Sequence, residues 1–176
     1  MERAADGARL AAYAGELIAL ATAGDRPAGT TVAAYAGVAD EPPTETLLDA
    51  LASRGARVLL PVTTGAGRLD WAAYEGWSGL VPARWGLLEP ATPRLGPEAL
   101  RGADLVVVPA LAVDRSGHRL GRGGGFYDRA LGAVPRDRRV AVVYDGELLD
   151  HVPAEPHDQE VGWALTPTGL TALVGR

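Results

Sequence analysis

Two uninterrupted apolar runs, residues 105–108 and 140–144, enclose a glycine-rich segment and a short helical pattern. Continuous apolar runs, as opposed to alternating ones, are typical of strands that helices cover on both faces. The order strand, loop, helix, strand is that of a βαβ unit, in which the two strands are parallel. We therefore expect an α/β fold, a three-layer α/β/α sandwich with a mostly parallel central sheet.

Other segments predict further elements of the same sandwich. Good helix formers and an apolar face predict a helix over residues 4–23 that ends near Gly24. A second helix is expected over residues 44–53 with Thr44 as its N-cap, and a third, of about eight residues, near Phe126. Further strands are expected over residues 30–36, 57–62, 69–75 and 161–166. No repeat, charge block or linker divides the chain, so we expect residues 1–176 to form one domain.

The glycine-rich segment reads Arg-Leu-Gly-Arg-Gly-Gly-Gly-Phe-Tyr-Asp from Arg119 to Asp128. Glycines let backbone N–H groups approach an anion, and the flanking arginines supply charge-assisted donors for phosphate. The spacing matches neither the Walker loop nor the common dinucleotide fingerprint. A plain glycine turn is the alternative, but we favour a phosphate-binding loop with Asp128 placed to meet a metal ion carried by the phosphate.

Composition excludes several classes of function. The chain has no cysteine, which rules out disulfides and thiolate catalysis, and all 17 of its basic residues are arginine, which rules out Schiff-base lysine chemistry. The net charge of −5 argues against a nucleic-acid partner. The sequence has no apolar stretch long enough to span a bilayer and no secretion signal at its start, so we expect a cytoplasmic protein without a membrane partner.

Several segments together resemble the 5-formyltetrahydrofolate cyclo-ligase family, also called 5,10-methenyltetrahydrofolate synthetase, over about residues 32–166. They are Ala34-Tyr35, Glu41-Pro42-Pro43-Thr44, Leu59-Leu60-Pro61, Gly86-Leu87-Leu88-Glu89-Pro90, residues 108–114, the loop from Arg119 to Asp128, residues 152–158 and Leu165-Thr166. The resemblance implies ATP- and Mg²⁺-dependent cyclisation of 5-formyltetrahydrofolate to 5,10-methenyltetrahydrofolate, with release of ADP and phosphate. In the family the formyl oxygen attacks the γ-phosphate, N10 then closes the ring, and phosphate departs. We expect a monomer whose partners are these small-molecule substrates.

The resemblance also implies roles for single residues. Residues 119–127 resemble the segment that holds ATP, with Arg122 and Tyr127 as catalytic candidates. The members of that segment are Arg119, Leu120, Gly121, Arg122, Gly123, Gly124, Gly125, Phe126 and Tyr127. Asp128 and Asp158 resemble the magnesium carboxylates, and Glu41 and Ala36 resemble folate contacts.

Structural roles are the alternative for each of these side chains. Asp128 would then stabilise a helix start and Asp158 a loop, Glu41 would be a solvated acid, and Ala36 and Tyr127 would be core residues. The same holds for three tryptophans that are candidates to line the folate pocket, namely Trp71, Trp77 and Trp85. His157 is expected to be a loop histidine, since the chemistry requires no general base there.

Members of the family usually begin with a basic helix that reaches the nucleotide phosphates. Only Arg3 and Arg9 stand near the start of this chain, so we expect that helix to be lacking. A non-catalytic folate or nucleotide binding module is therefore an alternative function. A third is an isomerase or transferase of similar architecture that acts on sugar phosphates or acyl carriers.

Overall fold

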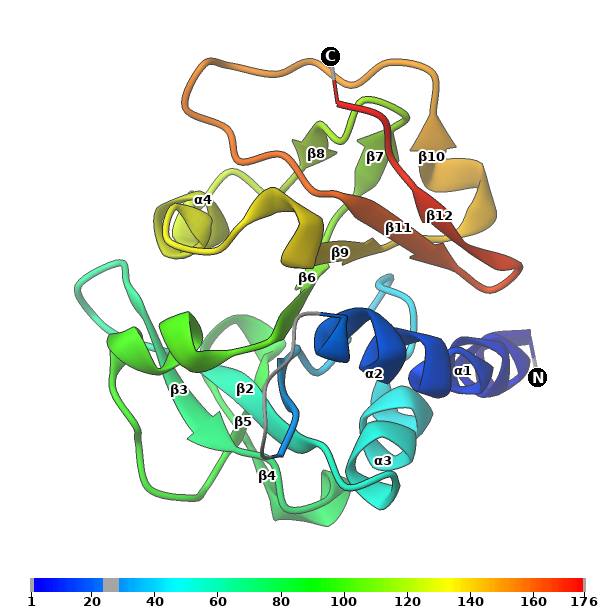
Figure 1. Ribbon diagram of the computed structural model, residues 1–176. Helices are drawn as coiled ribbons and strands as arrows, with labels where there is room; N and C mark the ends of the chain where they lie inside the picture. Colours follow the sequence, from blue (N-terminus) through cyan, green and yellow to red (C-terminus); the bar gives the residue numbers. More distant parts are fainter. Residues whose placement is uncertain (1, 24–28, 176) are drawn as a thin grey trace.

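The computed structural model describes residues 2–23 and 29–175, and within them a seven-stranded sheet forms the centre of the molecule (Figure 1). Its strands lie in the order β12, β11, β9, β6, β1, β2, β3. They are β1 (Thr31–Ala33), β2 (Arg57–Thr63), β3 (Leu69–Ala73), β6 (Leu105–Pro109), β9 (Arg139–Val142), β11 (Trp163–Thr166) and β12 (Gly169–Ala172). Each internal pair is parallel, and only the edge strands β3 and β12 are antiparallel to their neighbours.

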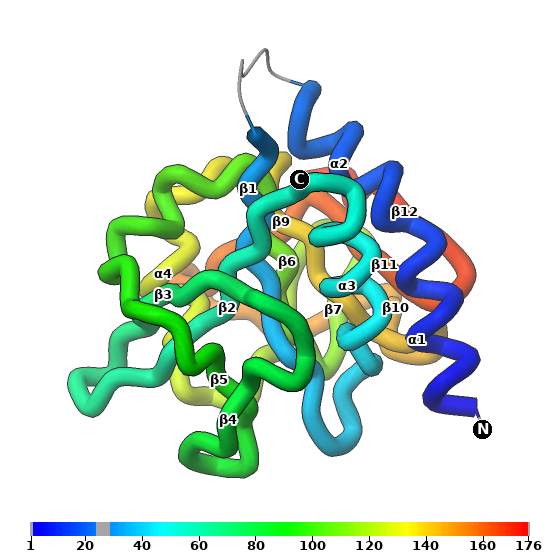
Figure 2. The backbone as a smooth tube through the Cα atoms, turned by 90° about the horizontal axis from the view of Figure 1, so that it is seen from below, coloured from blue at the N-terminus to red at the C-terminus, as the bar shows by residue number. Residues whose placement is uncertain are grey.

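Helices cover both faces of this sheet (Figure 2). On one face lie α1 (Glu2–Ala12), α2 (Ala14–Thr22) and α3 (Glu45–Ser53), whose leucines share a core with alternate residues of β1, β2, β6 and β9. On the other face, α4 (Phe126–Leu131) and the 3-10 helix η3 (Pro97–Gly102) close a second core. The expected three-layer sandwich with a mostly parallel sheet is confirmed.

Smaller elements extend the carboxyl ends of the central strands. One is a three-stranded sheet of β7 (Ala112–Asp114), β8 (Arg119–Leu120) and β10 (Leu148–Leu149), drawn at the top of Figure 1. Another is a hairpin of β4 (Leu80–Pro82) and β5 (Leu88–Pro90). The 3-10 turns are η1 (Trp77–Gly79), η2 (Arg84–Gly86), η4 (Arg136–Arg138) and η5 (Asp145–Glu147).

The expected helices differ from the observed ones in three details. The single helix over residues 4–23 is wrong, because the chain breaks at Tyr13: α1 packs against α3, whereas α2 packs on both α3 and β6. The expected end near Gly24 lies outside the described residues. Thr44 stands at the start of α3 but does not cap it, since its hydroxyl donates to the Tyr35 carbonyl and accepts from the N–H of Gly37. The α4 helix has six residues, fewer than expected.

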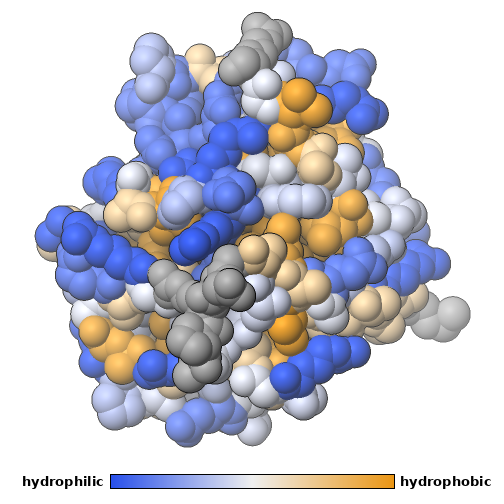
Figure 3. Space-filling model, in the orientation of Figure 1, coloured by the Kyte–Doolittle hydropathy of each residue, from blue (hydrophilic) through white to orange (hydrophobic). Residues whose placement is uncertain are grey.

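The surface view shows hydrophobic patches amid hydrophilic residues on the face drawn (Figure 3). The described helices are all too short or too polar to cross a bilayer. The two apolar cores lie between the three layers. The candidate functional residues are therefore sought in the loops at one edge of the sheet.

Candidate functional site

The carboxyl ends of the parallel strands β1, β6 and β9 meet at one edge of the sheet. In open α/β sheets this edge is where ligands bind. Residues 34–44 follow β1, residues 110–125 follow β6 and residues 143–147 follow β9. Nine of the thirteen sequence-predicted site residues belong to these segments, and Phe126, Tyr127 and Asp128 follow directly at the start of α4, so the fold brings them to one end of the molecule.

The glycine loop connects β8 to α4 and has the backbone shape expected of it. Gly123 and Gly125 have φ values of +86° and +63°, a region that side chains strain to adopt. A Cβ on Gly121 would lie 2.9 Å from Nη1 of Arg119, and one on Gly124 would lie 2.8 Å from the Phe126 ring. The sequence therefore needs glycine here both for conformation and for close packing of the flanking side chains.

Arg119 and Asp128, at the two ends of this loop, form an ion pair. Nη2 of Arg119 donates to Oδ1 of Asp128 at 3.0 Å, and the Arg119 side chain is only 4% exposed. The same carboxylate oxygen accepts the backbone N–H of Gln159 at 3.1 Å. Arg119 thus closes the base of the loop, while Asp128 connects it to the segment that carries Asp158.

Arg122 extends from the middle of the loop toward Glu41. Its Nε lies 3.4 Å from Oε1 of Glu41, whose side chain is 10% exposed. The other Glu41 oxygen accepts the N–H of Val38 at 3.1 Å, and the backbone carbonyl of Glu41 accepts from Arg3 at 2.7 Å. A residue expected to contact folate and one expected to contact ATP are therefore neighbours in the structure.

Three tyrosines stand around Glu41. The hydroxyl of Tyr144 donates to the Glu41 carbonyl at 3.4 Å. Burial raises the pKa of Tyr127, and although the cationic Arg119 lowers it, Glu41 raises it again, so the phenol stays protonated. Burial, with Glu41 next, raises the pKa of Tyr35, and among the described residues its buried hydroxyl has no hydrogen-bond partner. The site thus offers the neutral hydroxyls of Tyr35 and Tyr127 near the Glu41 carboxylate.

The apolar candidates divide between core and surface. Ala36 is buried in the core beneath α1 and α3, and Trp71 is buried beneath η3 and α4. Trp85 is 70% exposed, has a positive φ of 58°, and meets Phe126 edge-on with ring centroids 6.2 Å apart. Trp85 and Phe126 therefore form an aromatic wall beside the glycine loop, whereas Trp71 has a packing role.

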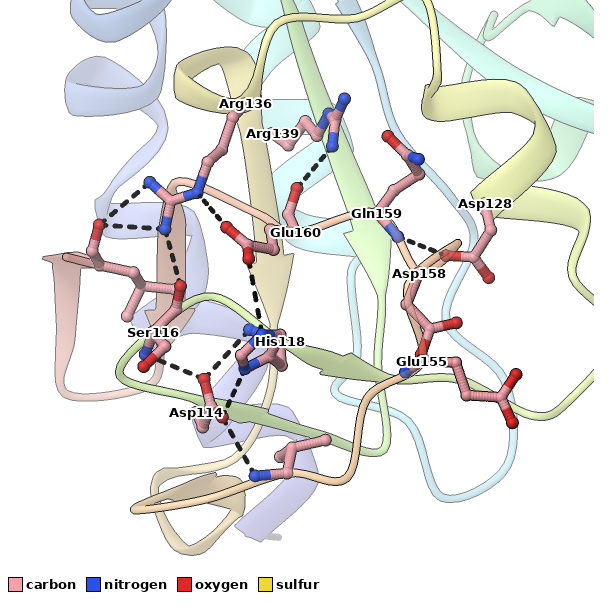
Figure 4. Close-up of polar contacts among 12 residues, drawn as sticks. Asp114, Ser116, His118, Asp128, Arg136, Arg139, Glu155, Asp158, Gln159 and Glu160 are labelled. Atoms are coloured by element: carbon pink, nitrogen blue, oxygen red, sulfur yellow. Dashed lines mark hydrogen bonds and ion pairs between the residues drawn. The ribbon is translucent and has the colours of Figure 1, made fainter. Parts of the chain in front are cut away.

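Asp128 and Asp158 lie on segments that meet in the fold, because the N–H of Gln159, the residue after Asp158, donates to Asp128 (Figure 4). Asp158 accepts the N–H of Glu155 at 2.7 Å through Oδ2, as a loop carboxylate does. Within the described part of the chain, Oδ2 of Asp128 has no hydrogen bond from a protein group, whereas Oδ1 of Asp158 lies 3.7 Å from Nε2 of His157. No three acidic or histidine side chains of the described residues converge on one point. Two carboxylates suit Mg²⁺, which is commonly completed by substrate phosphates and water.

A buried network holds the segment that carries Asp158 and Gln159 (Figure 4). Asp114 accepts from the backbone of Ser116, His118 and Val152, and its Oδ2 lies 3.0 Å from Nδ1 of His118. Nε2 of His118 lies 3.5 Å from Glu160, which pairs with Arg136 at 3.0 Å. Burial raises the pKa of Asp114, but the hydrogen bonds it accepts outweigh burial and lower it. His157, by contrast, is an exposed loop residue, as expected.

Sequence reasoning missed Tyr144, the Gln159 backbone and the role of Arg3. Nη1 of Arg3 also donates to the carbonyl of Ala39, which has a positive φ of 48°, at 2.6 Å. These contacts join positions far apart in the chain, and no local pattern marks them. The one available signal for Tyr144 is its place at the end of a predicted strand.

The sequence profile of the 5-formyltetrahydrofolate cyclo-ligase family matches residues 17–167. A 5-formyltetrahydrofolate cyclo-ligase of Mycolicibacterium smegmatis is 51% identical over 152 residues, covering 82% of this chain and 78% of that protein. The enzyme of the same name from Escherichia coli K12 is 34% identical over 142 residues, 78% of each chain.

Two solved structures have a fold similar to that of this chain. The 5,10-methenyltetrahydrofolate synthetase of Aquifex aeolicus superposes with a TM-score of 0.69 at 26% identity, covering 96% of this chain and 84% of that one. A Mycoplasma pneumoniae 5,10-methenyltetrahydrofolate synthetase gives a TM-score of 0.64 at 19% identity, with 93% and 85% covered, and supports the fold alone.

Proposed function

The chain belongs to the 5-formyltetrahydrofolate cyclo-ligase family and is an enzyme of that family, and from this premise we propose that it couples cleavage of ATP to ring closure. In the proposed reaction 5-formyltetrahydrofolate and ATP become 5,10-methenyltetrahydrofolate, ADP and phosphate. The single observation that carries the proposal is the meeting of Arg122 with Glu41, because it places the expected nucleotide loop against the expected folate contact.

The glycine loop supplies the nucleotide site in this proposal. Its backbone N–H groups and Arg122 face the phosphates, and Arg122, whose side chain is 57% exposed, is free to turn toward a bound γ-phosphate. Arg119 contributes differently. Its guanidinium is held by Asp128 and by the Pro109 carbonyl, so it fixes the base of the loop. Positioning and charge neutralisation are what phosphoryl transfer requires of a protein.

The chemical steps follow from the weak leaving ability of an amide oxygen. The formyl oxygen attacks the γ-phosphorus and ADP departs, which converts that oxygen into part of a phosphate leaving group. N10 then attacks the formyl carbon and gives up its proton, and the C–O bond breaks with release of phosphate. Glu41 orients the pterin by accepting hydrogen bonds from its amidine-like edge. Tyr127, kept neutral by its raised pKa, is a hydrogen-bond donor beside the reacting groups.

Asp128 and Asp158 are the residues that would hold Mg²⁺. The ion supplies neutralisation of phosphate charge when it is bound with the nucleotide. Asp128 accepts hydrogen bonds from Arg119 in the loop and from the N–H of Gln159, the residue after Asp158. These bonds hold the segments that carry the two carboxylates together.

The proposal is tested by following methenyltetrahydrofolate absorbance at neutral pH. The expected result is a rise that needs enzyme, 5-formyltetrahydrofolate, ATP and Mg²⁺ together, with one ADP formed per product. A thermal shift with each ligand but no turnover would instead identify a binding module. Stabilisation by a sugar phosphate, with indifference to ATP, would favour the isomerase or transferase class.

A further inference from the structure

Arg136 belongs to the network drawn in Figure 4, although the proposed reaction gives it no role. This half-buried residue lies in the 3-10 turn η4. Its Nε donates to Oε2 of Glu160 at 3.0 Å, and its Nη2 donates to the carbonyl of Ser116 at 2.9 Å. Nη1 and Nη2 also donate to the carbonyl of Leu173, each at 3.3 Å. One guanidinium therefore joins three segments that are far apart in the sequence.

The first of these segments is the turn between β7 and β8, residues 115–118, and it packs tightly against the second, residues 158–161. The N–H of Val161 donates to the carbonyl of Gly117 at 2.8 Å. A Cβ on Gly117 would meet the Val161 carbonyl and would lie 2.6 Å from Nη2 of Arg136. The turn and residues 158–161 are thus in direct contact, and Arg136 stabilises that contact by binding both.

The two segments that Arg136 joins both lead to Asp128. Arg119 directly follows the turn, and its Nη2 donates to Oδ1 of Asp128 at 3.0 Å. Gln159 directly precedes Glu160, and its N–H donates to the same Oδ1 at 3.1 Å. Arg136 therefore holds together the segments whose two donors orient the Asp128 carboxylate.

We propose that Arg136 is a positioning residue of the cyclo-ligase reaction, and that it acts through Glu160 on the orientation of Asp128. The inference rests on the proposed function, in which Asp128 is a carboxylate of the nucleotide site. A guanidinium suits this task because it stays charged and its planar fork binds a carboxylate and carbonyl oxygens at once. Without it, residues 158–161 lose their anchor, and Asp128 is oriented less firmly toward a bound nucleotide.

The first test measures kcat and the KM of each substrate for three variants. They are Arg136→Ala, Arg136→Lys and Glu160→Ala. Arg138→Ala is the matched control, because Arg138 lies in the same turn η4 and its side chain makes no hydrogen bond or ion pair with the residues that the structure describes.

Arg136→Ala should raise the KM for ATP about tenfold, a loss typical of residues that orient a ligand-binding carboxylate. The KM for 5-formyltetrahydrofolate should stay unchanged, because Glu41 lies on the segment after β1, whose described residues Arg136 does not contact. Arg136→Lys keeps the charge beside Glu160 and should recover about half of the loss on a logarithmic scale. Partial unfolding would lower kcat and leave both KM values unchanged, and that result would overturn the inference.

Combining Arg136→Ala with Glu160→Ala tests whether Arg136 acts through Glu160. Glu160→Ala alone should raise the KM for ATP about tenfold, as Arg136→Ala does. Residues that act as one unit are not additive, so the double variant should also show about a tenfold rise. A rise of about a hundredfold, the product of two independent effects, would overturn the assignment to Glu160.

Hydrogen exchange of backbone amides, measured by NMR without substrates, gives a readout that is independent of turnover. In Arg136→Ala the N–H of Gln159, which donates to Asp128, should exchange about tenfold faster. The N–H of Ala141, in the central strand β9, should keep its rate. Equal acceleration at both amides would indicate a loss of global stability alone and would overturn the inference.

Failure of the proposed function has a different signature. If the unmodified protein cyclises no substrate, the function is wrong, and the exchange rate of the Gln159 amide still decides whether Arg136 holds this segment against Asp128. If the protein cyclises its substrate and every variant has the same KM for ATP, the function stands and only the assignment of Arg136 fails.

Discussion

Arg122 and Glu41, which are 81 residues apart in the sequence, meet at 3.4 Å between Nε and Oε1 at the carboxyl edge of the sheet. Arg122 comes from the loop after β8 and Glu41 from the segment after β1. One side chain is largely exposed and the other largely buried, so Glu41 is fixed by its surroundings while Arg122 can move. A nucleotide that draws Arg122 toward its phosphates leaves the Glu41 carboxylate free to accept hydrogen bonds from a pterin.

Substitutions of the two residues should therefore change different kinetic constants. Glu41→Gln removes charge but little volume, and we expect the KM for 5-formyltetrahydrofolate to rise about tenfold or more with the KM for ATP little changed. Arg122→Ala should lower kcat by about a hundredfold or more, because it removes charge from the transferred phosphoryl group. Steady-state kinetics with each substrate varied in turn measures both effects. A Glu41→Gln enzyme impaired toward ATP alone would contradict the assignment.

Arg119 should matter mainly for folding. Its buried guanidinium pairs with Asp128, and removal leaves a carboxylate without its counter-charge. We expect Arg119→Ala to lower the free energy of unfolding by about 3–5 kcal/mol in denaturant titrations. Arg101→Ala, which removes an exposed pair with Glu98 in η3, is the control and should cost less than about 1 kcal/mol. If the two variants lose the same free energy of unfolding, burial does not make the Arg119 pair more stabilising than an exposed pair.

Asp114 predicts how stability depends on pH. The lowered pKa of Asp114 in the folded protein means that its stabilising contribution is complete above its ordinary value of 3.8 and is lost as the pH falls through the lowered value. Asp114→Asn should reduce the free energy of unfolding by about 1–3 kcal/mol at pH 7. The free energy of unfolding of the Asp114→Asn variant should then fall less steeply than that of the unmodified protein between about pH 4 and pH 2. Parallel curves of unfolding free energy against pH over that range would contradict the role of Asp114.

Asp158 should control the response to the metal ion without affecting the fold. Asp158→Asn keeps an oxygen to accept the Glu155 N–H but loses the charge that attracts a cation. We expect the Mg²⁺ concentration for half-maximal activity to rise about tenfold or more, with an unchanged unfolding midpoint. Asp150→Asn, at a fully exposed carboxylate, is the matched control. Identical Mg²⁺ titrations for both variants would remove Asp158 from the metal site.

The central architecture was predictable because its physical signal is local. Continuous apolar runs marked β6 and β9, and the glycines and Phe126 located the loop and the start of α4. The strands β7, β8 and β10 have only two or three residues each, too few for periodicity to show. Strand β12 follows β11 after a two-residue turn and was missed for a related reason, since its side chains are half-exposed or exposed.

Contacts between the candidate site residues could not be predicted from the sequence. The sequence predicts Arg119 as a nucleotide contact and Asp128 as a metal ligand, but no local pattern indicates that the two pair with each other. The capping pattern predicts the wrong partner for Thr44, because it does not reveal that the Tyr35 carbonyl and the Gly37 N–H are closer. Pairings of this kind depend on the tertiary fold.

The most direct test of the proposed reaction follows the formyl oxygen. Substrate is prepared with ¹⁸O in the 5-formyl group and converted by the enzyme with unlabelled ATP and Mg²⁺, and the phosphate is then analysed by mass spectrometry. If the glycine loop aligns the γ-phosphate with that oxygen, each phosphate released carries one ¹⁸O atom. Recovery of the label in water, with unlabelled phosphate, would contradict the transfer.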